Sequence, residues 1–320
     1  MAKDKAKKKK VRPLSIGGQA VMEGVMMRGT NSYSIAVRNQ EGLIGTVVRP
    51  VGKRSKKMFF LKWPFIRGVV NFGGSLSLGI KTIYESAEMA GLDDLEDENP
   101  SKFEKFLTDK FGDKLFDIIM MFSVVVALAL SVLLFMALPA WLSSLIKPVL
   151  PNRWLLSLFE GVLRITIFVG YLLLVSRTKE IKRVFAYHGA EHKTINCFES
   201  GAELTVENVR RHTRFHRRCG TSFLLIVMVV SMVVFFFVRI DNVWLKVLSR
   251  IALLPVVAGI SFEILRYAGR NDNLLIKIIS APGVSLQNIT TREPDDSMIE
   301  VAIEATNKVL ETEDNAGQQR

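Results

Sequence analysis

The sequence predicts a mainly α-helical membrane protein: a four-helix transmembrane bundle with a small cytoplasmic N-terminal β unit and a helical cytoplasmic loop. Three observations lead to this fold class. The 320-residue chain is 49% hydrophobic although 23% of its residues are charged, so apolar and charged residues must be concentrated in separate segments. Four windows approach the roughly 20 apolar residues that cross a bilayer. Two cysteines in the whole chain exclude a disulfide-stabilised scaffold.

The four apolar windows are residues 118–138, 154–176, 221–238 and 243–264. The first and third contain no charged residue. The second contains Glu160 and Arg164, which are four residues apart and are expected to neutralise each other inside the bundle. The fourth window is the most polar, and we expect it to span because an even number of spans keeps the basic ends on one side.

The distribution of basic residues predicts the orientation, because loops rich in Lys and Arg stay in the cytoplasm. Seven of them lie within residues 1–12 and ten within residues 177–220, whereas the loop between the first two spans has only two. We therefore expect both termini and residues 177–220 in the cytoplasm. Topology accounts for much of the net charge of +12, so membrane lipid is an expected partner and nucleic acid is not.

We divide the chain into seven segments: a basic disordered arm (1–14), a small β unit (15–62), an amphipathic helix with an acidic linker (63–117), two spans (118–176), a His-, Cys- and Arg-rich loop (177–220), two further spans (221–264) and a C-terminal segment (265–320). Runs at 34–38 and 43–48 predict a hairpin. Apolar positions on one side of residues 64–91 predict an amphipathic helix. Residues 281–283 predict a turn, and residues 294–297 predict a helix start.

All four histidines and both cysteines lie between His188 and Cys219, a tenth of the length. His188 and His192 are four residues apart and share one face of a helix. Together with Glu191 they form the pattern His-x-x-Glu-His, in which the two histidines bind zinc and the glutamate is the general base. His212 repeats this spacing with His216, which would place a second pair on another helix, with Cys219 on the same face.

The sequence therefore predicts a divalent-metal site, with zinc as the first choice, because zinc accepts imidazole and thiolate ligands together. The expected ligands are His188 and His192, completed by His216 and Cys219, and Glu191 is the expected general base. Three further residues are candidates for the site: His212, Cys197 and Glu263. For Glu263 the favoured alternative is an ion pair with Arg266. One alternative for the whole cluster is that the histidines are surface or capping residues and the arginines are topological anchors. The other is a phosphate or lipid site without a metal.

Five arginines lie close to these histidines, at positions 210, 211, 214, 217 and 218. Their charge opposes a bound dication but suits a phosphate or lipid head group. We expect Arg214 and Arg218 to hold an anionic substrate. The block at 17–28 lies on the same side of the membrane and contributes two more candidates, Glu23 as a catalytic residue and Arg28 as a substrate-binding residue. The equal alternative for this block is a tight turn that enters a strand.

Four segments resemble the YqhQ-like family of bacterial membrane proteins: Gly17–Arg28, Tyr187–Lys193, His216–Phe223 and Ala281–Gly283. The resemblance covers residues 13–310. It implies a multi-pass protein of the bacterial plasma membrane, of unknown function and labelled a predicted metal-dependent enzyme, with the histidine motifs as the site. The family often has Pro where this chain has Arg217, which puts the turn that presents His216 and Cys219 in doubt.

The expected function is a metal-dependent membrane enzyme, hydrolytic by default, acting on an anionic phosphate- or lipid-like substrate at the cytoplasmic face. An interaction or scaffold protein, whose basic loop binds a cytoplasmic partner or anionic lipid, is the first alternative. A transporter is the second, but Glu160, Arg164 and Glu263 are few polar groups for a transport path. The sequence leaves open whether the chain forms a homo-oligomer.

Overall fold

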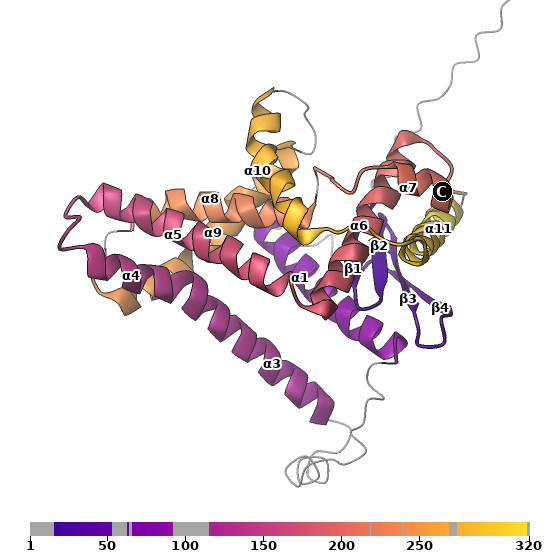
Figure 1. Cartoon of the computed structure of the whole chain (residues 1–320), viewed down its shortest axis with the longest axis horizontal. Helices are drawn as coiled ribbons and strands as arrows, with labels where there is room; N and C mark the ends of the chain where they lie inside the picture. Colours follow the sequence, from indigo (N-terminus) through magenta and orange to yellow (C-terminus); the bar gives the residue numbers. More distant parts are fainter. Residues whose placement is uncertain are drawn as a thin grey trace, which may run out of the picture.

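The computed structural model is mainly helical, with one small antiparallel sheet near the N-terminus, and it describes residues 16–52, 63, 66–91, 115–217, 219–238, 240–268 and 274–318. The long apolar helices extend to one side of the molecule, and the sheet and the more polar helices form the other side (Figure 1). The basic arm at 1–14 and the acidic linker within 92–114 lie outside the described residues.

The sheet contains four strands in sequence order, β1 (Gly17–Val21), β2 (Gly24–Arg28), β3 (Ser32–Arg38) and β4 (Ile44–Pro50), and each neighbouring pair is antiparallel. The predicted hairpin at 34–48 is confirmed as β3 and β4. Residues 17–28 form a second hairpin, in which β1 and β2 are joined by a two-residue turn. Glu23 in that turn has a φ of 50°, a left-handed conformation that is uncommon for residues other than glycine.

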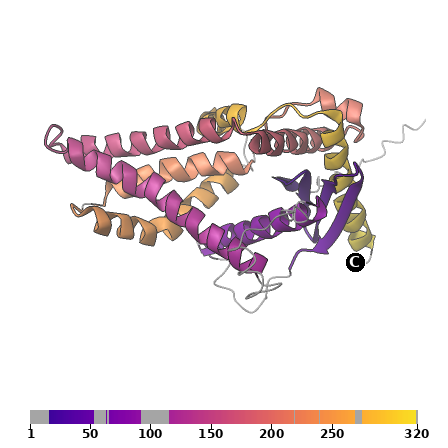
Figure 2. The same cartoon turned by 60° about the horizontal axis from the view of Figure 1, so that its bottom comes forward.

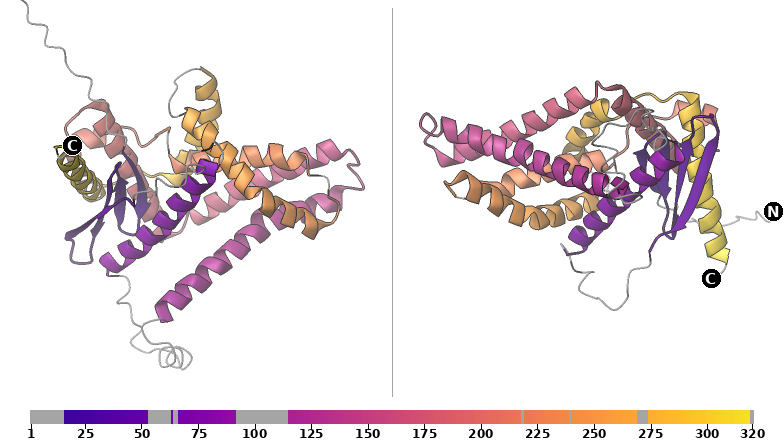
Figure 3. Two further views of the ribbon diagram at one scale, coloured as in Figure 1. Left: turned by 180° about the vertical axis from the view of Figure 1, so that it is seen from behind. Right: turned by 90° about the horizontal axis from the view of Figure 1, so that it is seen from below.

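Both faces of the sheet are covered, which explains why β2 and β3 are buried at almost every position. Val25 and Met27 pack against α6 (Lys179–Ser200) and α11 (Asp296–Gln318) on one face. Met26, between them, points to the opposite face and packs with Ile35 toward the end of α1 (Ile66–Met89), because successive side chains alternate across a strand. Figure 3 shows α1 and α11 on opposite sides of the sheet.

The predicted C-terminal helix is confirmed as α11. Its start is capped by Asp295, whose carboxylate accepts a hydrogen bond from Met298 N (2.9 Å), as expected for an acidic residue before a first helical turn. Farther along α11, Glu313 accepts hydrogen bonds from the backbone and the side-chain amide of Asn31 (both 2.6 Å). The helix is thereby fixed to the turn between β2 and β3.

The apolar half is built from α3 (Leu115–Val132), the π-helical turn η3 (Leu133–Ala137), α4 (Leu138–Ile146), α5 (Arg153–Val175), α8 (Gly220–Phe236) and α9 (Val243–Ala268). Three described segments are long and apolar enough to cross a membrane: Met121–Ile146, Arg153–Val175 and Val243–Ala268. The third predicted span is an apolar helix of 17 residues, α8, shorter than the roughly 20 residues of a full span. Helices α5, α8 and α9 lie together, and α3 diverges from them (Figures 1 and 2).

Four charged residues of α5 and α9 form one cluster. Glu160 of α5 contacts Arg164 at 3.4 Å, as predicted, and also binds Arg250 of α9 and contacts Lys246 at 3.7 Å. Glu160 and the two arginines are each 4% or less exposed. One carboxylate therefore joins two apolar helices through three cations.

The prediction of a turn at residues 281–283 is wrong, because α10 (Leu274–Thr290) continues through Pro282. Gly283 lies against α8, where an added Cβ would be 2.8 Å from the Cβ of Ser222. The glycine therefore serves close packing of two helices and not a chain reversal.

Candidate metal centre

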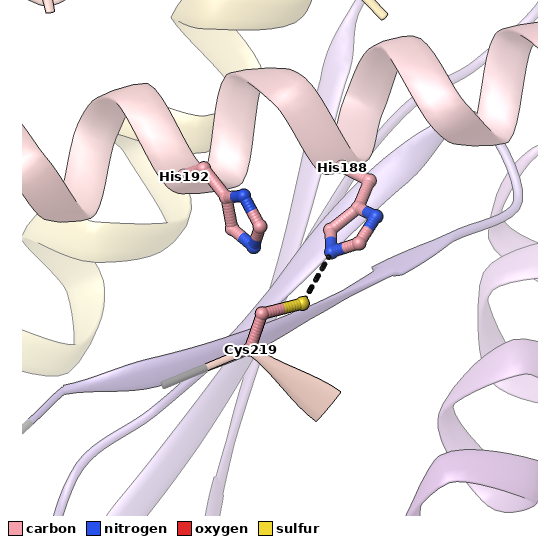
Figure 4. Close-up of side chains that lie close together, drawn as sticks. All are labelled: His188, His192 and Cys219. Atoms are coloured by element: carbon pink, nitrogen blue, oxygen red, sulfur yellow. Dashed lines mark hydrogen bonds between the residues drawn. The ribbon is translucent and has the colours of Figure 1, made fainter. Parts of the chain in front are cut away.

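The site begins with the helix α6, which presents His188 and His192 on one face, as their spacing predicts. Their ring centroids are 4.3 Å apart. Cys219 faces them from the N-terminus of α8, which it caps by accepting a hydrogen bond from Thr221 N (3.4 Å). One nitrogen of each ring and the sulfur all lie within 4.8 Å of one another. Figure 4 shows both rings pointing from α6 toward the sulfur. We call these three residues the triad.

Backbone carbonyls fix the tautomer of both rings. His188 Nδ1 lies 2.8 Å from Thr290 O, and His192 Nδ1 lies 2.6 Å from Arg214 O. A carbonyl can only accept, so each Nδ1 carries its hydrogen and each neutral ring keeps a lone pair on Nε2. The thiol of Cys219 donates to Nε2 of His188 (3.2 Å). Holding the outer nitrogen in this way is typical of histidines that bind metals.

Burial disfavours the charged forms of His192 and Cys219. Burial, with the neighbouring His188, lowers the pKa of His192 to about 2, so this ring is a neutral donor at all physiological pH values. Burial also raises the pKa of the Cys219 thiol, although hydrogen bonds from Thr221 and Ser222 oppose this effect. A bound dication would favour the thiolate, since a coordinating thiol loses its proton.

Glu191 lies beside the triad as a fully buried carboxyl group. Burial raises its pKa to about 8, against the opposing effects of His188 and of a hydrogen bond from the Ala20 backbone. Its Oε2 has no hydrogen-bond partner among the described residues. Gly18 of β1 lies so close that an added Cβ would be 2.9 Å from the Glu191 Cγ and Cδ atoms. The backbone of β1 therefore lies directly against Glu191, and only glycine leaves room for this contact.

His216 lies next to the triad and outside it. Its ring centroid is 5.7 Å from that of His192, and its Nε2 is 3.6 Å from a carboxylate oxygen of Glu199. Gln287 of α10 holds the His216 backbone by accepting from its N–H (2.8 Å) and donating to its carbonyl (2.7 Å). His216 is thus placed to complete or adjust the coordination only after a movement of its ring.

The prediction that His212 and His216 share a second helix is wrong, because α7 (Val206–Arg211) ends before His212. The segment that follows gives its carbonyls to side chains of α6 and not to a helix. Arg214 O accepts from His192, and Asn196 Nδ2 donates to Thr213 O (2.7 Å) and Phe215 O (3.1 Å). His212 itself bonds Asn208 O (2.8 Å) and Ser200 Oγ (3.1 Å), at the end of α6 away from the triad.

The structure places the other acidic and sulfur candidates apart from the triad. Cys197 is buried in the core between α6 and the sheet. Glu23 forms an ion pair with Arg183, with an Nε–Oε1 distance of 2.6 Å. Glu263 of α9 accepts from Arg67 of α1 (2.6 Å) and contacts Arg266 at 3.9 Å, so the predicted Arg266 pair is accompanied by a tighter one.

The three substrate-binding arginines have different surroundings. Arg214 donates to Thr291 O and lies 3.9 Å from Glu293. Arg28, at the end of β2, lines a cavity of about 330 Å³. Arg218 lies outside the described residues. The sequence does not predict Gln287 or Thr290, because they lie 71 and 102 residues from the histidines that they contact and Thr290 acts through its backbone carbonyl.

The triad opens into a cavity of about 740 Å³ formed by β1, α1, α6 and α8. The polar lining consists of the triad, Glu191 and His216 together with Gln19, Ser75 and Thr221, and much of the remainder is apolar. The described lining residues include no Lys or Arg. The cavity adjoins the smaller one that Arg28 lines, since Gly17, Gly18 and Ser75 border both.

Two comparisons with known proteins give a family. The sequence model described as "Protein of unknown function (DUF1385)" matches residues 63–312. The chain is also 40% identical to the uncharacterized protein YqhQ of Bacillus subtilis (strain 168) over 306 residues, which is 94% of either chain. No solved structure matches it.

Proposed function

We propose that this chain, which belongs to the DUF1385 family of proteins of unknown function, is a zinc-dependent hydrolase at the cytoplasmic face of a bacterial cell membrane. One observation carries the proposal. Two imidazoles, each with an Nε2 lone pair, and one thiol converge within 4.8 Å, and backbone carbonyls hold the Nδ1 atoms of both rings.

The residues present fit zinc. Imidazole nitrogen and thiolate sulfur are the donors that zinc prefers, and three protein ligands leave the fourth position open, as in catalytic sites. The unpartnered Oε2 of Glu191 is a second sign, because a buried carboxylate oxygen without a hydrogen bond is costly. Glu191 lies beside the three donors and supplies an acid–base group with no structural partner on that atom.

The proposed chemistry is hydrolysis of an ester or related bond. A zinc ion held by the triad would supply Lewis-acid polarisation of the substrate. One water is consumed: its hydroxyl group adds to the electrophilic centre, and its proton leaves with the departing group. Glu191 is the residue that takes and returns this proton, because it is a buried carboxyl group next to His192 with one oxygen that has no hydrogen-bond partner among the described residues.

Three helices that are apolar enough to span a bilayer support the membrane location. The excess of basic residues at the N-terminus and in residues 177–220 supports a cytoplasmic site. In this arrangement α8 also spans the membrane, as the third of four spans along the chain, and Cys219 lies at its cytoplasmic end. An anionic substrate group would be held from the adjoining cavity by Arg28, because the lining described for the main cavity offers no cation.

Metal analysis of the purified full-length protein tests the proposal. We expect about one zinc per chain, because catalytic and structural zinc sites bind near one-to-one. His188→Ala with His192→Ala should remove the metal, and His212→Ala, a matched histidine outside the triad, should retain it. Less than about a tenth of an equivalent in the unmodified protein would overturn the proposal and favour the scaffold alternative.

A further inference from the structure

We infer that the substrate of this hydrolase is a membrane lipid, whose acyl chain lies in the cavity between α1 and α6. The inference rests on the proposed function, and it concerns the part of the cavity that metal chemistry leaves unexplained. Phe72, Leu76, Ile80 and Ile83 of α1 line this part. Their spacing places them on one face of the helix.

An ordinary surface helix buries its large apolar side chains, whereas α1 exposes them. Its buried positions are small or polar, namely Gly68, Gly79, Thr82 and Ser86. Its four large apolar cavity residues are 39–52% exposed. Because exposed apolar groups in a row mark sites that meet another apolar body, this face requires a partner that the described part of the chain does not supply.

The cavity is continuous with the apolar half of the molecule. Phe223 and Leu224 of α8 form part of its wall, and the Phe223 ring lies 5.5 Å from that of Phe72. On its other side α1 is fastened to α9, where an added Cβ on Gly68 would be 3.0 Å from the Cα of Gly259. A lipid chain can therefore pass from the bilayer beside α8 into the cavity without crossing water.

The polarity of the cavity matches an amphiphile. The triad and Glu191 line the cavity where the bond to be cleaved must lie, and the α1 wall consists of the four large apolar side chains with Ser75 and Gly79 between them. A volume of about 740 Å³ falls within the range of about 300–1,000 Å³ for small-molecule sites. A small polar substrate would leave the α1 face uncovered, whereas a lipid places an acyl chain on it and an ester or phosphoester at the triad.

Photolabelling of the full-length protein in nanodiscs of phosphatidylethanolamine and phosphatidylglycerol tests this inference. The probe is a trace phospholipid with a diazirine in the middle of one acyl chain, and labelled peptides are mapped by mass spectrometry. Labelling of α3 is the internal control for contact with bulk lipid. The diagnostic peptide is residues 184–195 of α6, because this helix packs against the sheet and α11, and a lipid chain reaches it through the cavity.

We expect label on residues 184–195 in the unmodified protein. Leu76→Trp, which fills the cavity, should reduce that label about tenfold, equivalent to about 1.4 kcal/mol of binding free energy, and leave α3 labelling unchanged. Ser77→Trp is the matched control, since Ser77 is exposed on the same turn and is not among the cavity residues. If Leu76→Trp fails to fold by thermal melting, Leu224→Trp blocks the opposite wall.

The outcomes separate this inference from the proposed function. Label absent from residues 184–195 in a protein that holds one zinc overturns the lipid substrate and leaves the hydrolase. Equal labelling of the Leu76→Trp and Ser77→Trp proteins also overturns it. Label on α6 in a protein without metal overturns the hydrolase, and the cavity is then a lipid-binding site without that chemistry.

Discussion

Two buried glutamates of this chain, Glu160 and Glu191, have opposite surroundings. Glu160 lies among apolar helices and is bound by Arg250, contacted by Arg164 and Lys246, and hydrogen-bonded by Ser143 (3.2 Å). Glu191 lies beside the two imidazoles and the thiol of the triad, and one of its oxygens has no hydrogen-bond partner among the described residues. The contrast teaches that burial alone does not mark a functional carboxyl group. What marks it is burial beside a cavity without the cations that a structural role requires.

The largest expected effect concerns the proposed chemical role of Glu191. Glu191→Gln keeps the size of the side chain and removes the acid–base group, so hydrolysis of a fluorogenic ester should fall by about 10²–10⁴-fold. Zinc content, measured on the same sample, should stay near one per chain. Full activity in this variant would remove Glu191 from the proposed chemistry.

The second prediction concerns the structural member of the pair. Glu160→Gln leaves Arg164 and Arg250 buried without their carboxylate, which costs about 3–5 kcal/mol of unfolding free energy by analogy with other broken buried pairs. Denaturant titration in detergent measures this loss. Glu191→Gln is the matched control and should unfold close to the unmodified protein. Equal destabilisation by both changes would contradict the distinction between the two glutamates.

The third prediction uses the metal as a stabilising ligand. Free zinc at about 100 times its dissociation constant should stabilise the unmodified protein by about 2.7 kcal/mol, because it binds only the folded triad. Thermal melting with zinc and with a chelator measures the difference. Glu160→Gln should keep this increment, since its site is separate, and His192→Ala should lose it. An increment that survives in His192→Ala would place the ion elsewhere.

The smallest expected effect concerns Gly18 of β1, which lies against Glu191. Gly18→Ala places a Cβ 2.8 Å from Met26 O and 2.9 Å from Glu191, and such overpacking costs about 1–3 kcal/mol. Gly17→Ala is the matched control, because an added Cβ there meets no atom within 4 Å. Chemical denaturation and ester hydrolysis should both detect the difference. Equal behaviour of the two variants would show that β1 does not position Glu191.

The sequence predicted the parts of this molecule that local periodicity determines. The histidine face of α6, the β3–β4 hairpin and the start of α11 depend on neighbours within a few residues. The resemblance to the YqhQ-like family was confirmed by the comparisons. The expected triad members His188, His192 and Cys219 meet in the structure, whereas their roles as ligands remain a proposal.

Long-range contacts explain what the sequence could not predict. Thr290, which fixes the His188 tautomer, is 102 residues away in the chain, and it acts through a carbonyl that every residue possesses. The end of α7 at Arg211 follows from contacts that α6 makes with the next segment, and Pro282 stays helical within α10, where Gly283 packs closely on α8. The local periodicity of the sequence does not indicate such distant partners, so the second histidine pair and the turn at 281–283 were predicted wrongly.

The sulfur of Cys219 has a consequence for how this protein is made. It caps the helix α8 and meets a histidine that lies 31 residues earlier, on a helix of the other half of the molecule. The three donors therefore do not exist as a set until α6 has docked on the start of α8. An ion held by these three donors would bind only after this docking, and it would then link the two halves of the molecule.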